Sequence, residues 1–190
     1  MVKLFLNDSL AVLFVNYKKS MSSVIPLKQF PKSIIISGTA RNVGKTTFAC
    51  QLIEKYKPEK VIAIKISPHF HSIEADAEII EQNEDFVIVR EHKKESSKDS
   101  ARMLNAGASE VYFIMTLDNN LLKVVNFLST IVDTNSRIII ESAAIRRYIL
   151  PQKFYVVYNN DNPNIKNQNT DLEKYIDEWI NGEIVFLPYL

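Results

Sequence analysis

The sequence predicts an α/β fold, in which a mostly parallel central sheet is covered by helices on both faces. Short apolar runs rich in β-branched residues alternate with longer segments of helical periodicity, as in such folds. The first run, Ser33 to Ser37, leads through a glycine-bounded turn into a helical segment. The chain has 190 residues, of which 46% are hydrophobic, so it can bury one core but not two comfortable ones. We therefore expect a single domain over residues 33–190.

Further apolar runs have the composition of buried strands. Each holds three to five consecutive apolar residues, mostly Val, Ile, Phe or Tyr. The expected strands are 61–64, 86–89, 111–115, 137–140 and 154–158, and a last strand is expected at 184–187. The region between Pro68 and Asp85 carries two histidines and five acids, so it is expected to form surface structure beside the functional site.

Four segments are expected to be helical, chiefly because their apolar residues recur on one helical face. They are 48–56, 100–106, 121–131 and 172–180. Pro58 ends the first of them. Asp99 is suited to cap the second helix at its N-terminus, and Gly107 is its natural C′ residue.

The turn between the first strand and the first helix reads GTARNVGKTT and is bracketed by Gly38 and Gly44. Backbone N–H groups of such a turn point at phosphate oxygens, and the following helix dipole adds roughly half a positive charge. Lys45 supplies a full positive charge, and the Thr46 hydroxyl would bind Mg²⁺. We therefore expect a phosphate-binding loop with Mg²⁺ as its cofactor. The expected nucleotide-binding residues of this loop are Arg41, Asn42, Val43, Gly44, Lys45, Thr46 and Thr47.

Charge gives no support for a macromolecular polyanion as partner. The net charge is +1, and no run of Lys or Arg longer than a pair forms a basic face. We expect neither a nucleic-acid nor a membrane partner, and a small-molecule ligand fits better.

Residues 1–32 are expected to form an N-terminal extension of uncertain role. Its apolar pieces, 4–6 and 10–15, are separated by Asn7, Asp8 and Ser9, and neither approaches the ~20 residues that span a bilayer. No small-residue cleavage site follows them. We therefore expect an unprocessed cytoplasmic protein, in which the extension is a partner arm, an added edge hairpin or a segment without a specific role.

Lys65 follows the expected strand 61–64, at the end where parallel sheets bind ligands. There it would reach a phosphate or a second anionic ligand, unless its stem only covers the strand end. His69 and His71 flank Phe70, so both imidazoles lie on one side of an extended segment. They are candidates for an anion contact or are ordinary loop histidines. A structural zinc site is not expected, because no cysteine or third histidine is close in sequence.

Glu141 follows the run 138–140, where a nucleotide-hydrolysing fold places the acid that holds Mg²⁺ through water. We expect Lys45 and Glu141 to be the catalytic residues, and Thr46 and Glu141 to hold the metal. The alternative is that Glu141 only lies near the N-terminus of a short helix at 143–148. Asn160 follows a later strand and is the candidate contact to the base. The guanine-reading motif Asn-Lys-x-Asp is not intact, so GTP and ATP both stay open.

Together these motifs resemble the molybdopterin-guanine dinucleotide biosynthesis adaptor, MobB, in the SIMIBI class of P-loop proteins. The resemblance rests on the loop, on Lys65 with the two histidines that follow it, and on the block KDSARMLNAGASEVYFI at 98–114. The loop has five residues between its glycines, one more than the strict phosphate-loop pattern, as in SIMIBI relatives. In the family the 98–114 block lies by the nucleotide, so the resemblance implies a role for Asp99 beyond capping.

The resemblance implies a P-loop NTPase fold, a three-layer α/β/α sandwich that hydrolyses GTP or ATP slowly and assists a partner enzyme in molybdenum cofactor biosynthesis. The loop spacing is also similar to dethiobiotin synthetase, so an ATP-dependent small-molecule kinase or ligase is the alternative. A non-hydrolysing, nucleotide-dependent regulator is a third interpretation, and a homodimer stays open. The residues expected around a second ligand are Lys65, His69, His71, Lys98, Asp99 and Ser100.

Overall fold

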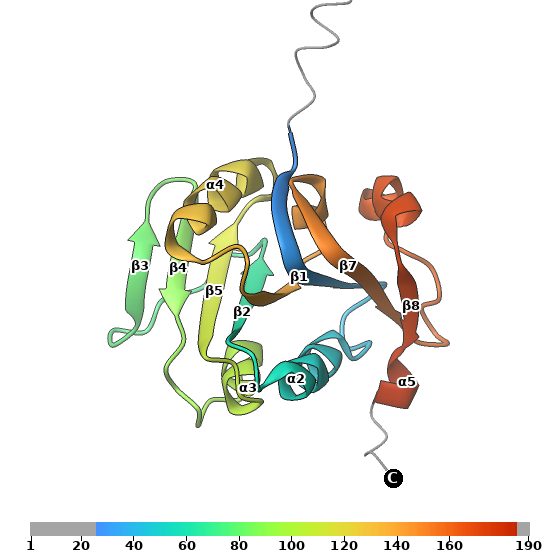
Figure 1. The fold of residues 1–190 in the computed structure, drawn as a ribbon, viewed down its shortest axis with the longest axis horizontal. Coiled ribbons are helices and arrows are strands. Elements are labelled where there is room, and N and C mark those ends of the chain that lie inside the picture. The colour runs from blue at the N-terminus through green and yellow to red at the C-terminus, as the bar shows by residue number, and fades with distance from the viewer. Residues whose placement is uncertain (1–25, 186–190) are drawn as a thin grey trace, which may run out of the picture.

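The computed structural model describes residues 26–185, which form one eight-stranded sheet with helices on both faces (Figure 1). The strand order is β3-β4-β5-β2-β6-β1-β7-β8. The strands are β1 (Lys28–Gly38), β2 (Val61–Ser67), β3 (Glu78–Gln82), β4 (Phe86–Arg90), β5 (Glu110–Thr116), β6 (Arg137–Glu141), β7 (Ile149–Tyr158) and β8 (Glu178–Asn181). The helices are α2 (Lys45–Tyr56), α3 (Asp99–Asn105), α4 (Leu121–Ile131) and α5 (Gly182–Val185), with 3-10 segments η1 (Asp118–Asn120), η2 (Ala144–Arg147) and η3 (Asn167–Tyr175).

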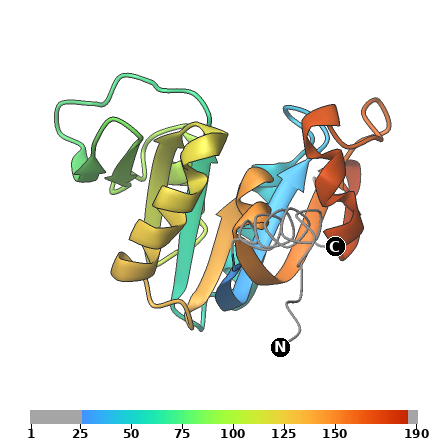
Figure 2. The ribbon, with the colours of Figure 1, turned by 90° about the horizontal axis from the view of Figure 1, so that it is seen from above.

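The sheet is parallel except at one edge. Strand β4 runs antiparallel to β5, and β3 runs antiparallel to β4. The chain reverses between β3 and β4 because the Asn83 side-chain oxygen accepts hydrogen bonds from the backbone N–H groups of Asp85 and Phe86, at 2.9 and 3.1 Å. Figure 2 shows this edge, with the loop before β3, on the side of the sheet opposite to η3 and β8.

Alternating strand residues build two cores, one on each face of the sheet. One core joins residues such as Ile35, Ile64 and Ile140 to α4, η2 and η3. The other joins residues such as Ile36, Ala63 and Ile139 to α2 and α3. Both faces of the central strands are therefore buried, which explains their unbroken apolar runs. The predicted three-layer α/β/α arrangement with a mostly parallel sheet is confirmed.

Two expectations near the C-terminal end are wrong. The helix expected at 172–180 is replaced by η3 and by strand β8, which pairs in parallel with β7. The amphipathic pattern does not form a helix because β7 offers a free edge with which this segment pairs. Asp177 holds the segment at that edge, since its backbone N–H donates to the Phe154 carbonyl and its side chain accepts from the Phe154 N–H. In place of a strand at 184–187, residues 182–185 form α5, and residues 186 and 187 lie outside the described part of the chain.

The first strand begins before the expected domain boundary. Residues 28–32 belong to β1, and Phe30 is fully buried although Pro31 interrupts the register with β7. The remainder of the expected extension, residues 1–25, lies outside the described residues. Among the helices of residues 26–185, none is long and apolar enough to cross a membrane.

Candidate functional site

The loop between β1 and α2 wraps around the side chain of Lys45. Asn42 and Gly44 adopt positive φ angles of 58° and 98°, which turn the backbone tightly before the helix. The Lys45 ammonium donates a hydrogen bond of 2.6 Å to the Ala40 carbonyl inside the loop. A Cβ atom at Gly38 would lie 2.7 Å from the Lys45 side chain, so glycine is required where the loop closes over it. Burial lowers the pKa of Lys45, and the nearby Glu141 carboxylate acts in the opposite direction.

A threonine and a glutamate meet beneath this loop. Thr46, in the first turn of α2, donates a hydrogen bond of 2.8 Å to Glu141 Oε2. Glu141 is the last residue of β6 and is only 4% exposed, so both of its oxygens need partners. Lys65 supplies the other partner, because its ammonium contacts Oε1 of the same carboxylate.

Sheet register explains why Lys65 and Glu141 meet. Lys65 on β2 is the register partner of Glu141 on β6. Both follow the alternation of Ala63 and Ile139, so both face α2 and α3. Two residues 76 positions apart therefore form an ion pair because parallel strands end together at this edge of the sheet.

Asp99 extends the same network from α3. Its Oδ2 accepts a hydrogen bond of 2.9 Å from Lys65. Burial alone would raise the pKa of Asp99, but the Lys65 ammonium and its hydrogen bond hold that pKa below the ordinary carboxyl value. The expectation that Asp99 caps the helix is wrong: Lys98 is the N-cap residue, no side chain caps the helix, and Asp99 is its first residue. Gly107, in contrast, follows the helix with a positive φ of 105°, as expected.

The loop, Thr46, Glu141, Lys65 and Asp99 surround one open cavity of about 490 Å³. Arg102 also lines it and donates a hydrogen bond of 3.0 Å to the Thr47 hydroxyl. Of the expected nucleotide-binding residues, the cavity is lined by Arg41, Asn42, Gly44, Lys45, Thr46 and Thr47, while Val43 is buried behind the loop. The cavity therefore brings cationic side chains together with the oxygens of Thr46 and Glu141, which suits an oxyanion held together with a metal ion.

The oxygen donors that line this cavity fit Mg²⁺. The Thr46 hydroxyl and the Glu141 carboxylate offer two oxygen atoms 2.8 Å apart, and oxygen is the ligand that Mg²⁺ prefers. In the described part of the chain, no group of three or more His, Cys, Asp or Glu residues could hold a metal alone. A magnesium ion here would therefore complete its shell with waters and ligand oxygens, as it usually does at phosphate sites.

The other residues expected around a second ligand divide between neighbouring cavities. His71, Lys98 and Ser100 line a cavity that adjoins the loop site, and Lys65 and Asp99 line both. His69 lines a third cavity beside Gly38 and Glu141. The imidazole centroids of His69 and His71 are 6.4 Å apart, and both residues are exposed.

Asn160 lines none of the cavities that contain the loop. Its side-chain amide donates a hydrogen bond of 2.7 Å to Glu183 at the start of α5. No sequence pattern pointed to Gly182, where a Cβ atom would lie 1.8 Å from the Val43 carbonyl oxygen, or to Lys166, which lines the cavity beside Lys45. Both come from the C-terminal segment, which has no motif, so only the fold brings them to the loop.

No protein-family model, no curated protein and no solved structure matches the chain. The fold and site define a three-layer α/β/α protein in which a glycine-bounded loop, a lysine and a threonine–glutamate pair meet at the carboxyl ends of parallel strands. These groups, and not the fold, determine the chemistry that is possible at this site.

Proposed function

We propose that this protein binds a nucleoside triphosphate together with Mg²⁺ at the β1–α2 loop and hydrolyses it slowly. The observation that carries the proposal is the combination of Lys45, held by a loop carbonyl, with the Thr46–Glu141 pair 2.8 Å apart directly beneath. A lysine at the start of a helix suits phosphate oxygens, and the paired oxygens of Thr46 and Glu141 suit Mg²⁺.

Each residue has a distinct task in this proposal. Lys45 exchanges its contact with the Ala40 carbonyl for the β and γ phosphates and neutralises their charge. Thr46 and Glu141 hold Mg²⁺, which supplies further neutralisation of the phosphate charge. Arg102 lines the same cavity and contacts the terminal phosphate in this proposal.

Slow turnover follows from the partners of Glu141. A carboxylate that already accepts from the Lys65 ammonium and from Thr46 is a weak base for activating water. Such a protein acts through its bound nucleotide more than through its product. This supports the adaptor hypothesis, in which the chain assists a partner enzyme; the specific role in molybdenum cofactor biosynthesis rests on the sequence resemblance alone.

A second candidate function is an ATP-dependent small-molecule kinase or ligase. The observation that favours it is the cavity adjoining the loop site across Lys65 and Asp99, which gives an acceptor molecule room beside a terminal phosphate. Turnover separates the two functions, because an adaptor would stay below about 1 per second under all conditions, whereas a kinase or ligase would accelerate with one metabolite. Binding without any product would instead indicate a regulator.

The proposal is tested with the variant Lys45→Ala and calorimetric titration of ATP and GTP in the presence of Mg²⁺. Losing the charge-assisted contacts of Lys45 should weaken binding by about a hundredfold or more. Lys55→Ala is the matched control, since Lys55 is an exposed lysine in the last turn of the same helix. Equal affinity in the wild type and Lys45→Ala, or no nucleotide binding by the wild type, would contradict the proposal.

A further inference from the structure

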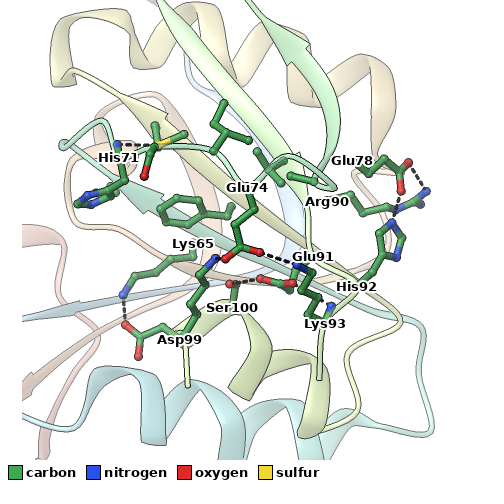
Figure 3. A pocket seen from close by; sticks show the side chains of 18 of the residues that line it. Lys65, His71, Glu74, Glu78, Arg90, Glu91, His92, Lys93, Asp99 and Ser100 are labelled. Carbon is green, nitrogen blue, oxygen red and sulfur yellow. Dashed lines mark hydrogen bonds and ion pairs between the residues drawn. The ribbon is translucent and has the colours of Figure 1, made fainter. Parts of the chain in front are cut away.

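A second cavity, of about 370 Å³, opens beside the loop site on the same face of the sheet. Its size lies within the range typical of pockets for small organic ligands. Figure 3 shows Lys65 and Asp99 at one end, Arg90, Glu78 and His92 at the other, and Glu91 with Ser100 between them. We call this space the β4–β5 cavity.

The floor of the β4–β5 cavity continues the row of residues that holds the loop site. Lys65 pairs in register with Glu141 on one side and with Phe113 of β5 on the other, and Phe113 pairs with Val89 of β4. Register partners point to the same face of the sheet. From β6 to β4, this row of side chains therefore changes from charged to apolar. Ile73, Ala77 and Met115 complete the apolar lining.

The roof is the loop 68–77, and its contacts are mostly ionic. Glu74 pairs with Lys93 and Lys98, and Asp76 pairs with Lys93. The backbone N–H of His71 also contacts the sulfur of Met115, at 3.2 Å. The loop therefore covers the apolar floor, and ion pairs hold its carboxylates to Lys93 and Lys98.

The charges around the β4–β5 cavity leave one carboxylate without a cation. The lining holds five Asp or Glu residues and four Lys or Arg residues. All four basic side chains form ion pairs: Lys65 with Glu141 and Asp99, Arg90 with Glu78 and Glu110, Lys93 with Glu74 and Asp76, and Lys98 with Glu74. Within residues 26–185, Glu91 forms no ion pair, although it lies inside the lining.

The hydrogen bonds of Glu91 fix it in place without neutralising it. Its Oε1 accepts from the Lys93 backbone N–H at 2.9 Å, and its Oε2 accepts from the Ser100 hydroxyl at 2.7 Å. Ser100 is only 3% exposed, so the residue that holds this carboxylate oxygen is itself buried. Each carboxylate oxygen can accept a second hydrogen bond, so Glu91 presents an oriented negative charge to the cavity.

We propose that the β4–β5 cavity binds a small organic cation, with an ammonium group on Glu91 and an apolar body against Val89, Phe113 and Met115. An anion would find every lysine and arginine of the lining already paired and would face the surplus carboxylate. A bare metal ion would find an apolar floor in place of oxygen ligands. Binding of such a cation requires no nucleotide at the loop.

The test is an NMR titration of the isotope-labelled full chain, without nucleotide, using n-butylammonium chloride as the probe. Saturable shifts are expected in the amide signals of Glu91, Ser100 and Phe113. 1-Butanol, of similar shape but neutral, should bind about tenfold more weakly, because it lacks the charge-assisted hydrogen bond, and butyrate should not bind. Equal binding of butanol and butylammonium, or shifts confined to other regions, would overturn the proposal. Because no nucleotide is present, the result is independent of the function proposed for the loop.

Two variants attribute the binding to this cavity. Glu91→Gln keeps the shape and the contact to Ser100 but removes the charge, and should weaken butylammonium binding by about tenfold. Ala77→Phe leaves the charge in place and fills the space from the roof, so it should abolish the shifts. Glu84→Gln removes an exposed charge in the β3–β4 turn, outside the lining, and should bind like the wild type. Unchanged affinity in both Glu91→Gln and Ala77→Phe would refute the assignment.

Discussion

Two lysine–carboxylate networks lie side by side on one face of the sheet, and they are built differently. At the loop site, Lys65 and Glu141 are 18% and 4% exposed and are held by the register of neighbouring strands. Over the β4–β5 cavity, Glu74 and Lys93 are each 43% exposed and join a loop to the segment after β4. Removal of Lys65 from the first network would leave the Glu141 carboxylate buried without its cation, whereas water can replace any member of the second network.

This difference suits two kinds of ligand. A site built on strand ends keeps its geometry, as the binding of a phosphate and a metal ion requires. A cavity roofed by exposed ion pairs can open at little cost and admit a molecule from solvent. The contrast can be tested by removing one member from each network.

The largest effect is expected for Lys65→Met at the loop site. Methionine preserves much of the volume but leaves the Glu141 carboxylate buried without its cation, which should lower the free energy of unfolding by about 3 kcal/mol. Urea denaturation followed by circular dichroism measures this change. The double variant Lys65→Met/Glu141→Gln should recover most of the loss, because no unpaired charge is then buried. A Lys65→Met protein as stable as the wild type would show that the two networks do not differ as described.

The loop site was largely predictable from sequence. The residues Gly38 to Thr47 are contiguous, and their turn chemistry by itself indicates a phosphate loop. Glu141 and Lys65 were also found, since each ends an apolar run and strand ends gather at one edge. Their direct ion pair was not foreseen, because strand order and register are set by the whole sheet.

The β4–β5 cavity was not predictable from sequence in the same way. Its floor comes from the antiparallel strand β4 and from β5, its roof from the loop 68–77, and Glu91 from a segment without a motif. The misassigned segment at 172–180 has the same cause: an open strand edge on β7 outweighed a helical pattern. Local sequence patterns indicate the secondary structure of a segment and the contacts between residues close in sequence. Contacts between segments far apart in sequence depend on how the strands pair in the sheet.

An intermediate effect is expected at Thr46, which connects the buried network to the proposed metal. Thr46→Val removes the hydroxyl that donates to Glu141 and should lower the free energy of unfolding by about 1 kcal/mol. It should also remove the Mg²⁺ dependence of nucleotide binding in calorimetric titrations. Thr46→Ser keeps the hydroxyl and should retain both properties. If the valine variant kept the full magnesium effect, Thr46 would not be a metal ligand.

The smallest effect is expected for Glu74→Gln in the exposed network. Hydrogen bonds and charge from Lys93 and Lys98 lower the pKa of Glu74 from 4.5 to about 2. Because this pKa is lower in the folded chain, Glu74 contributes stability above about pH 4.5, and the contribution is lost as the pH falls through about 2. The variant should therefore unfold at slightly lower urea concentration than the wild type at pH 6, and the difference should shrink as the pH is lowered toward 2. At 1 M salt, where the screening length is about 3 Å, the difference at pH 6 should also disappear, whereas the loss in Lys65→Met should persist. A salt-resistant effect at Glu74 would mean that the roof of the cavity is as firmly held as the loop site.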